Sequence, residues 1–182
     1  MVHDEDLNLV RQTLDGDRCA FGQIVEKYQK AVFNVALRMT HNAKDAEDIA
    51  QEVFLKVYVR LRTFNPEYRF FSWLYRIAIN ESLNCLDRKG RYEELNEEMV
   101  AGGLDLEEVT DANAQSKIVG DAVMSLKPDH RVVVVLRHFE DLSYEEIAQA
   151  LEISEKKVKS RLFTARQVLR DLLLKRGFGT HD

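Results

Sequence analysis

Apolar side chains recur at helical spacing along most of this 182-residue chain, and this periodicity restricts its fold more than any other feature. Apolar residues three and four positions apart run from Leu7 to Leu14, from Phe21 to Ala36 and from Ala46 to Leu61. No stretch alternates apolar and polar residues for long enough to indicate a strand, and Val132–Leu136 is expected to be buried helix because helix formers flank it. The sequence therefore predicts an all-α fold.

Proline and glycine set the expected boundaries of the fourth helix. Pro66 interrupts the helical pattern, so residues 62–70 are expected to form a loop. The helix after this loop is expected to begin near Ser72, a suitable capping residue. It is expected to end near Arg88, because Gly90 stands where a helix stop is common.

An acidic segment divides the chain. Residues 93–121 contain nine acids and one base, for a net charge of −8, together with the pair Gly102-Gly103 and only weak periodicity. These properties are typical of a solvated linker. We therefore predict two small helical domains, residues 1–92 and 122–182, joined by an acidic linker. A single domain with a long loop is disfavoured, because structureless loops beyond about 12 to 15 residues are uncommon in compact domains.

The composition excludes several classes of function. Cys19 and Cys85 are isolated, so neither a disulfide framework nor a metal site is expected, and no cofactor is indicated. No run approaches the roughly 18 apolar residues of a membrane span, and the start of the chain is unlike a signal peptide, so we expect a soluble cytoplasmic protein. The histidines are scattered and no nucleophile motif appears, so we do not expect an enzyme.

The overall charge of −5 argues against a nucleic-acid partner only as an average. Residues 1–92 carry a net charge of +1 and residues 122–182 carry +2, so the acidic excess belongs to the segment between them. The two predicted domains are each compatible with nucleic acid.

Aromatic and basic residues gather around the loop at 62–70. Six of the 16 aromatic residues fall between positions 64 and 75, and four arginines lie among or beside them. Aromatic rings stack on unpaired bases, at about 1 to 3 kcal/mol per base, while arginines neutralise phosphates. This composition is typical of a platform for single-stranded nucleic acid. Packing against neighbouring helices is the alternative, and for Phe64, Tyr68 and Arg69 both interpretations stay open.

The segment at 141–176, DLSYEEIAQALEISEKKVKSRLFTARQVLRDLLLKR, predicts a helix-turn-helix. A short helix at 143–151 and a turn at 152–154 precede a long helix, whose residues 156–176 contain eight bases and one acid. The second helix of such a motif enters the major groove. The residues expected on its exposed N-terminal face are Lys159, Ser160 and Phe163. A merely solvated face is disfavoured, because the bases lack compensating acids.

A third segment, DAEDIAQEVFLKVY at 45–58, places polar side chains on one face of a helix. Its polar residues are Asp45, Asp48, Gln51 and Glu52. Acids in the first turn of a helix interact favourably with its dipole and stabilise the helix. That structural role would explain these acids if the segment stood alone.

The order of these features resembles the extracytoplasmic-function (ECF) group of bacterial RNA polymerase sigma factors. The resemblance rests on the acidic-faced helix, the aromatic loop that runs into FFSWLYRIAIN, the acidic linker, LKPDHRVVVVLRHFEDLSYEEIAQAL and the basic helix that follows. It implies two helical domains, called regions two and four, which give core polymerase its promoter specificity. The main alternative is a two-domain helix-turn-helix regulator that never contacts polymerase, but it leaves the acidic helix and aromatic loop without a role.

The resemblance assigns three sets of site residues. The helix at 45–58 would dock on the clamp of the polymerase β′ subunit through Asp45, Asp48, Gln51 and Glu52. Region two would capture and melt the minus-ten element through Phe64, Asn65, Tyr68, Arg69, Trp73, Arg76, Asn80, Arg88 and Lys89. Region four would read the minus-thirty-five duplex through Ser154, Lys156, Lys157, Lys159, Ser160, Arg161, Phe163 and Arg166.

Two departures from the family pattern concern the recognition helix. Lys156-Lys157 replaces the usual Gly-Thr, and Thr164 stands where an Arg is common. The additional cations should raise phosphate affinity, and the missing Arg should alter the preferred base steps.

The resemblance also implies partners. These are core RNA polymerase, through its β′ clamp and β subunits, promoter DNA, and an anti-sigma protein that covers both domains. We expect the free chain to bind promoters weakly, because an uncommitted acidic linker can screen the basic faces.

Overall fold

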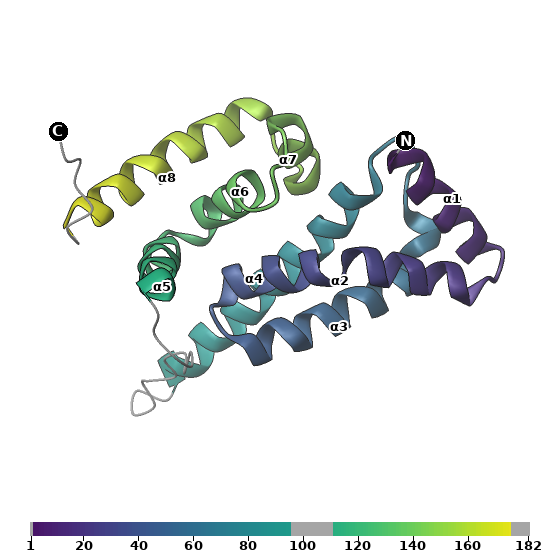
Figure 1. Ribbon diagram of the computed structural model, residues 1–182, viewed down its shortest axis with the longest axis horizontal. Coiled ribbons are helices and arrows are strands. Elements are labelled where there is room, and N and C mark those ends of the chain that lie inside the picture. The colour runs from purple at the N-terminus through teal and green to yellow at the C-terminus, as the bar shows by residue number, and fades with distance from the viewer. Residues whose placement is uncertain (1, 96–110, 176–182) are drawn as a thin grey trace.

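The computed structural model describes residues 2–95 and 111–175, which form eight α-helices and one short 3-10 helix (Figure 1). In chain order the elements are α1 (Val2–Leu14), α2 (Arg18–Thr40), α3 (Ala43–Arg60), η1 (Leu61–Thr63), α4 (Phe70–Leu95), α5 (Asp111–Met124), α6 (Pro128–His138), α7 (Tyr144–Leu151) and α8 (Glu155–Lys175). Within the described ranges no residue is in a strand, and the predicted all-α fold is confirmed. The segment Val132–Leu136 lies inside α6, as expected.

Helices α1 to α4 form a bundle in the first half of the chain. The Asp17 side chain accepts hydrogen bonds from the first turn of α2, and Asn42 does the same for α3, so both helices begin at a capping residue. Their apolar stripes meet in a core in which Ile24, Val53 and Leu74 are fully buried. The bundle fixes the outward faces of α3 and α4.

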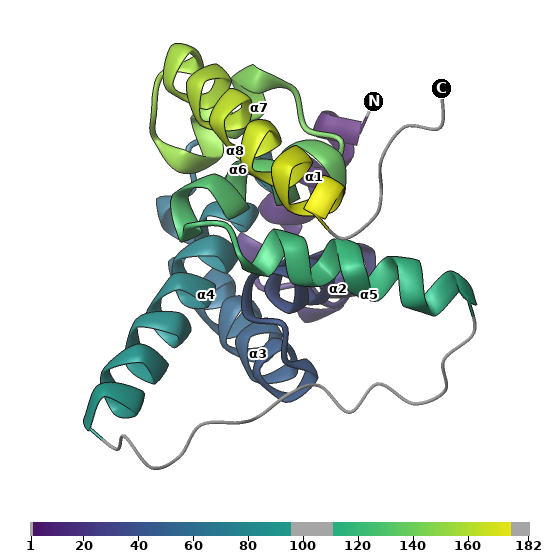
Figure 2. The same cartoon turned by 90° about the vertical axis from the view of Figure 1, so that its left-hand side faces the viewer.

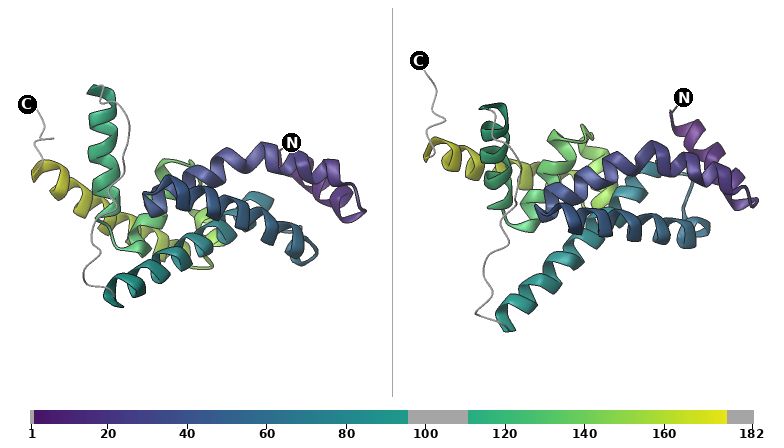
Figure 3. Two further views of the ribbon diagram at one scale, coloured as in Figure 1. Left: turned by 90° about the horizontal axis from the view of Figure 1, so that it is seen from below. Right: turned by 60° about the horizontal axis from the view of Figure 1, so that its bottom comes forward.

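The predicted limits of α4 are wrong at both ends. The helix begins at Phe70, and Ser72 is a buried residue inside its first turn, where the Ser72 amide donates to the Arg69 carbonyl at 3.1 Å. It continues through Gly90 to Leu95, because an exposed helical glycine costs only about 1 kcal/mol relative to alanine. The C-terminal part of α4 therefore projects beyond the rest of the bundle (Figures 2 and 3).

Helices α7 and α8 form the expected helix-turn-helix. Ser143 caps α7 in a reciprocal capping box with Glu146, and the turn passes through Glu152 in the left-handed conformation, with φ of 53°. The Ser154 hydroxyl then accepts a hydrogen bond from the Lys157 amide at 3.3 Å, so it caps α8 as predicted.

The acidic segment at 93–121 is helical at both of its described ends. Residues 93–95 continue α4 and residues 111–121 belong to α5. Residues 96–110, and with them most of the acids expected to screen the basic faces, lie outside the described residues. The domain boundaries stay a prediction.

The two halves of the chain pack against each other. Helices α5 and α6 contact α2, and α7 contacts α4, so α6 to α8 lie along one side of the first bundle (Figures 1 and 2). At the centre of this contact Arg131 of α6 is 6% exposed.

Of the described helices, none has the length and apolar character needed to cross a membrane.

Candidate functional site

The polar face of α3 is open to solvent. Asp48, Gln51 and Glu52 are exposed, whereas Asp45 is partly buried and forms an ion pair with Lys89 of α4. Three of the four residues predicted to contact polymerase therefore lie exposed on one surface, and the fourth is partly buried beside α4.

An apolar groove adjoins this polar face. It runs between α2 and α3 around a cavity of about 740 Å³, and its floor includes Phe21 and Tyr58, whose ring centroids are 4.9 Å apart. Leu55 is 63% exposed and Tyr58 is 49% exposed beside Gln51. Leu55 and Tyr58 were not among the residues predicted to bind polymerase, because helical spacing does not show whether an apolar side chain off the main stripe is covered. Large exposed apolar side chains of this kind mark protein-binding surfaces.

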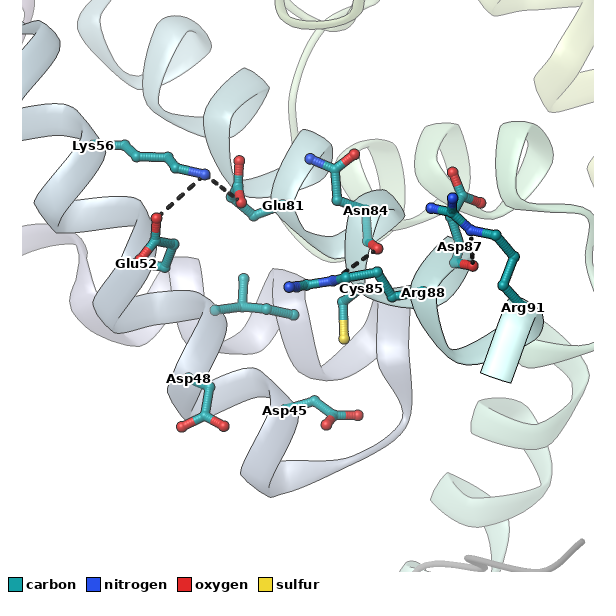
Figure 4. A pocket seen from close by; sticks show the side chains of 11 residues that line it. Asp45, Asp48, Glu52, Lys56, Glu81, Asn84, Cys85, Asp87, Arg88 and Arg91 are labelled. Carbon is teal, nitrogen blue, oxygen red and sulfur yellow. Dashed lines mark hydrogen bonds and ion pairs between the residues drawn. The ribbon is translucent and has the colours of Figure 1, made fainter. Parts of the chain in front are cut away.

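A charged cleft separates α3 from α4 (Figure 4). Its cavity of about 690 Å³ is lined by acids of α3 and by acidic and basic residues of α4. Lys56 forms ion pairs with Glu52 at 3.3 Å and with Glu81 at 2.6 Å, and together with Lys89 these contacts join the two helices electrostatically. Cys85 lies in the same cleft, where burial raises the pKa of its thiol. No described group of three His, Cys, Asp or Glu side chains is arranged to hold a metal.

The aromatic residues of the loop divide into buried and exposed sets. Phe64 is 8% exposed, and its ring lies 5.4 Å from Phe70 and 5.5 Å from Trp73 between centroids. This packing favours a structural role for Phe64. Tyr68 is 49% exposed and is the ring that the loop presents to solvent. Asn65 holds the loop in a turn, since its side chain accepts from the Glu67 amide at 3.0 Å.

The arginines of this surface face the second half of the chain. Arg76 donates to Glu152 at 2.6 Å and to the Gln149 carbonyl at 3.0 Å, and Arg69 lies 3.6 Å from Glu146. The remaining minus-ten candidates are exposed along α4 and are Asn80, Arg88 and Lys89. The structure thus places all the minus-ten candidates on the loop and α4, but it gives Arg69, Arg76 and Lys89 intramolecular partners.

Helix α8 presents a basic face. Most minus-thirty-five candidates are exposed on it, namely Ser154, Lys156, Lys157, Lys159, Ser160, Phe163 and Arg166. Phe163 is 65% exposed, although it is a large aromatic residue. Arg161 is half-buried and forms an ion pair with Asp129, so this candidate supports the fold of the motif. Thr164 donates to the Ser160 carbonyl at 3.2 Å.

The contact between the halves contains a partly buried acid, Glu140. Tyr75 of α4 donates a hydrogen bond to Glu140 at 2.8 Å. Burial raises the pKa of the Glu140 carboxyl, although the hydrogen bond from Tyr75 and the charge of Arg38 act in the opposite direction. Burial and the neighbouring Glu140 also raise the pKa of Tyr75. Both groups titrate differently if the halves separate.

Two protein families match this chain. Residues 24–92 match Sigma-70 region 2, and residues 116–169 match Sigma-70 region 4. The first match covers α3, the loop and most of α4, and the second covers the helix-turn-helix.

Curated relatives match nearly the whole chain. The chain is 35% identical to the RNA polymerase sigma-H factor of Pseudomonas aeruginosa, over 93% of its own length and 94% of that protein. It is 35% identical to the ECF RNA polymerase sigma factor SigW of Bacillus subtilis, over 90% of this chain and 94% of that one. It is 33% identical to the ECF RNA polymerase sigma-E factor of Escherichia coli K12, over 90% and 92%.

Two solved structures share the fold. CnrH in complex with the cytosolic domain of CnrY aligns with a TM-score of 0.72 at 27% identity, covering 93% of this chain and 97% of that chain. The sigma factor RpoE in complex with the anti-sigma factor NepR from Bartonella quintana aligns with a TM-score of 0.73 at 22% identity, covering 84% and 96%.

Proposed function

Because the chain belongs to the ECF group of RNA polymerase sigma factors, we propose that it recruits core polymerase to promoters in the cytoplasm through three surfaces. The first binds polymerase, the second captures melted minus-ten DNA and the third reads the minus-thirty-five duplex. The role requires no catalysis by the chain itself.

The polymerase-binding surface is the exposed face of α3 together with its apolar groove. Gln51 belongs to both parts, with acids on one side and Leu55 and Tyr58 on the other. The exposure of the apolar side chains of Leu55 and Tyr58 beside acids carries the proposal. A bundle that acted alone would gain stability by covering these apolar side chains. We propose that the β′ clamp of polymerase covers this surface, and that contacts with Asp48 and Glu52 set its orientation.

The minus-ten surface is the loop at 62–70 and the first half of α4. Tyr68 offers an exposed ring to an unstacked base, while Arg69 and Arg76 offer cations to the phosphates beside it. Phe64 and Trp73 pack against each other and line the same cavity as Tyr68. Asn80, Arg88 and Lys89 continue the polar surface along α4 toward flanking DNA.

The minus-thirty-five surface is the N-terminal half of α8. Its capped first turn and Lys156 and Lys157 would engage phosphates, because exposed helix amides and lysines attract anions. Lys159, Ser160 and Phe163 lie exposed at the positions from which a recognition helix reaches base edges. The side chain of Lys159 is positioned by Glu155 at 3.6 Å and by the Tyr144 ring at 5.6 Å from its centroid.

We also propose that an anti-sigma protein regulates the chain. The solved RpoE structure is a complex with the anti-sigma factor NepR, and CnrH is bound by the cytosolic domain of CnrY. An apolar groove that binds polymerase is also available to such a competitor.

Reconstitution tests this function. The purified full chain should bind core polymerase and direct run-off transcription from promoters identified by sequencing polymerase-bound DNA with and without the chain. A helix-turn-helix regulator that works independently of polymerase would bind promoter DNA but would neither bind core nor support transcription. That result would eliminate the sigma function in favour of the regulator.

A further inference from the structure

We propose that the helix-turn-helix also acts as a latch on the DNA-capture surface of the same chain. The latch consists of Glu146, Gln149 and Glu152, which hold Arg69 and Arg76. These arginines cannot bind phosphate until α7 and its turn move away. The latch depends on the minus-ten function proposed above for these arginines.

Arg76 has the most complete contacts in the latch. One terminal nitrogen donates to the Glu152 carboxylate at 2.6 Å, and the other donates to the Gln149 carbonyl at 3.0 Å. Gln149 lies in the last turn of α7, where the helix dipole is negative, and its carbonyl also accepts a long hydrogen bond from the Glu152 amide at 3.4 Å. The guanidinium of Arg76 in the first half therefore completes the C-terminus of a helix in the second half.

The backbone conformation of Glu152 does not explain why the turn has a glutamate at this position. Glu152 has φ of 53°, a region that glycine adopts without strain but that other residues adopt at a cost. A glycine would therefore suit the turn better. What glutamate adds is a carboxylate, and that carboxylate pairs with Arg76.

Arg69 lies within a second contact of the same kind. Its Nε is 3.6 Å from Glu146, whose carboxylate also accepts from the Ser143 amide in the capping box at 2.8 Å. The capping box fixes the position of this acid relative to α7. The two arginines flank the first turn of α4 and thus meet two acids spaced along one short motif.

The space that DNA would enter lies between the same elements. A cavity of about 490 Å³ is bounded by Tyr68 and Trp73 on one side and by Ile153 and Glu155 on the other. Glu145 and Glu152 also line it, so a phosphate chain would meet carboxylates there. An incoming strand must therefore displace α7 as well as replace the acids.

Partly exposed ion pairs such as these are individually weak, so the latch is reversible. The side chain of Arg76 is 31% exposed and that of Glu152 is 69% exposed. A partner that binds either half more tightly in the open arrangement can shift the population without any covalent change. Core polymerase, which would hold both halves apart on a promoter, is such a partner.

The test measures how tightly the free, full-length wild type and two variants bind a fluorescent single-stranded DNA 20-mer of random sequence. The latch variant combines Glu146→Gln with Glu152→Gln, and Gln at position 146 preserves the capping box. The control combines Glu26→Gln with Glu47→Gln, which removes the same charge from exposed positions that contact neither arginine and lie outside the cavity. We expect the latch variant to bind about tenfold more tightly than wild type and the control to change by no more than about twofold. Equal affinities in the two variants would overturn the latch.

A second variant excludes partial unfolding as the cause of tighter binding. Glu152→Gly removes the carboxylate and relieves the strained φ, so the turn should become more stable while DNA affinity rises. Spin labels at native Cys19 and at Asp171→Cys, in a Cys85→Ser background, report the separation of the halves. We expect longer distances in the latch variant than in the control, and unchanged distances would contradict the proposal.

The two proposals fail in different ways. If wild type does not support transcription with core polymerase, the sigma function fails, but the affinities and distances still decide whether the latch exists. If wild type supports transcription and the latch variant binds and opens like the control, the latch fails and the sigma function stands.

Discussion

The Arg131 guanidinium of α6 donates a hydrogen bond to the carbonyl oxygen of Met39, 2.6 Å away in the last turn of α2. The same side chain donates to the carbonyls of Met124 at 2.6 Å and Leu126 at 3.1 Å, after which the chain enters α6. A single buried cation thus joins carbonyls at the ends of two helices from opposite halves. Burial lowers the pKa of Arg131, but an arginine this strongly basic stays charged.

Arg131→Met should destabilise the packing of the two halves against each other. It leaves buried carbonyls without donors, so we expect the free energy of unfolding to fall by about 3 kcal/mol. Urea denaturation followed by circular dichroism measures this change. Arg170→Met, at an exposed position of α8 with a 3.8 Å ion pair to Asp171, should change it by less than about 0.5 kcal/mol. Equal losses in the two variants would show that burial of Arg131 is irrelevant.

Leu55→Asp should weaken binding to core polymerase by at least about tenfold without lowering the melting temperature. The side chain is 63% exposed, so the fold does not depend on it, whereas a carboxylate in the apolar groove would oppose a covering partner. Fluorescence anisotropy with labelled chain and purified core measures the affinity. Leu174→Asp is the matched control, because Leu174 is 49% exposed on α8 in the other half. Unchanged binding by Leu55→Asp would exclude the groove from the interface.

Lys159→Ala should reduce the salt dependence of promoter binding by the complete polymerase complex. Loss of one phosphate contact lowers the slope of log affinity against log salt by about 1. If Lys159 reads a base edge instead, one promoter position should lose its preference. Lys175→Ala, at the far end of α8, should leave both slope and preference unchanged. A Lys159→Ala protein that matches wild type in both measurements would remove this residue from the site.

Glu140→Gln should stabilise the protein near pH 8, because it removes a partly buried charge and keeps an acceptor for Tyr75. The folded-state pKa of Glu140 is raised, so the native state binds its proton more tightly than the unfolded state. Wild-type stability from this group is therefore present at low pH and is lost as the pH rises through the raised pKa. We expect a gain of about 0.5 kcal/mol at pH 8, since solvent screens a half-buried group.

The pH dependence of that gain separates charge burial from other causes. The difference between Glu140→Gln and wild type should shrink as the pH falls toward the pKa of Glu140, because the wild-type carboxyl then becomes neutral. Thermal melts from pH 5 to 8 measure it, with Glu145→Gln as an exposed control on α7. A gain that is constant across this range would contradict the assignment to a buried charge.

Local sequence signals predicted most of the elements. Apolar spacing gave the helices, and Ser143 and Ser154 marked the starts of α7 and α8, because capping depends on neighbouring backbone groups alone. The same reasoning failed at Ser72, where packing of α4 on the bundle outweighed a weak capping preference, and at Gly90, where an exposed glycine costs too little to end a helix.

The candidate surfaces were predictable only in part. Residue type and spacing found the basic face of α8, since exposed lysines need no tertiary partner to remain exposed. They could not separate Phe64, which is buried in an aromatic cluster, from Tyr68, which faces solvent. They also did not identify Leu55 and Tyr58 as an exposed apolar surface, because periodicity does not show which apolar side chains find a partner.

The sequence by itself determined the helical content, the helix-turn-helix and the sigma family of this protein, because each depends on short-range periodicity, caps and motif order. Only the tertiary structure decided that Arg76 meets Glu152 across 76 positions of sequence and that Arg131 meets Met39 across 92. Such contacts arise from how the two halves pack, and no local signal in either half encodes the partner. The tertiary structure therefore determines which predicted DNA-binding cations are free and which are held by the chain itself.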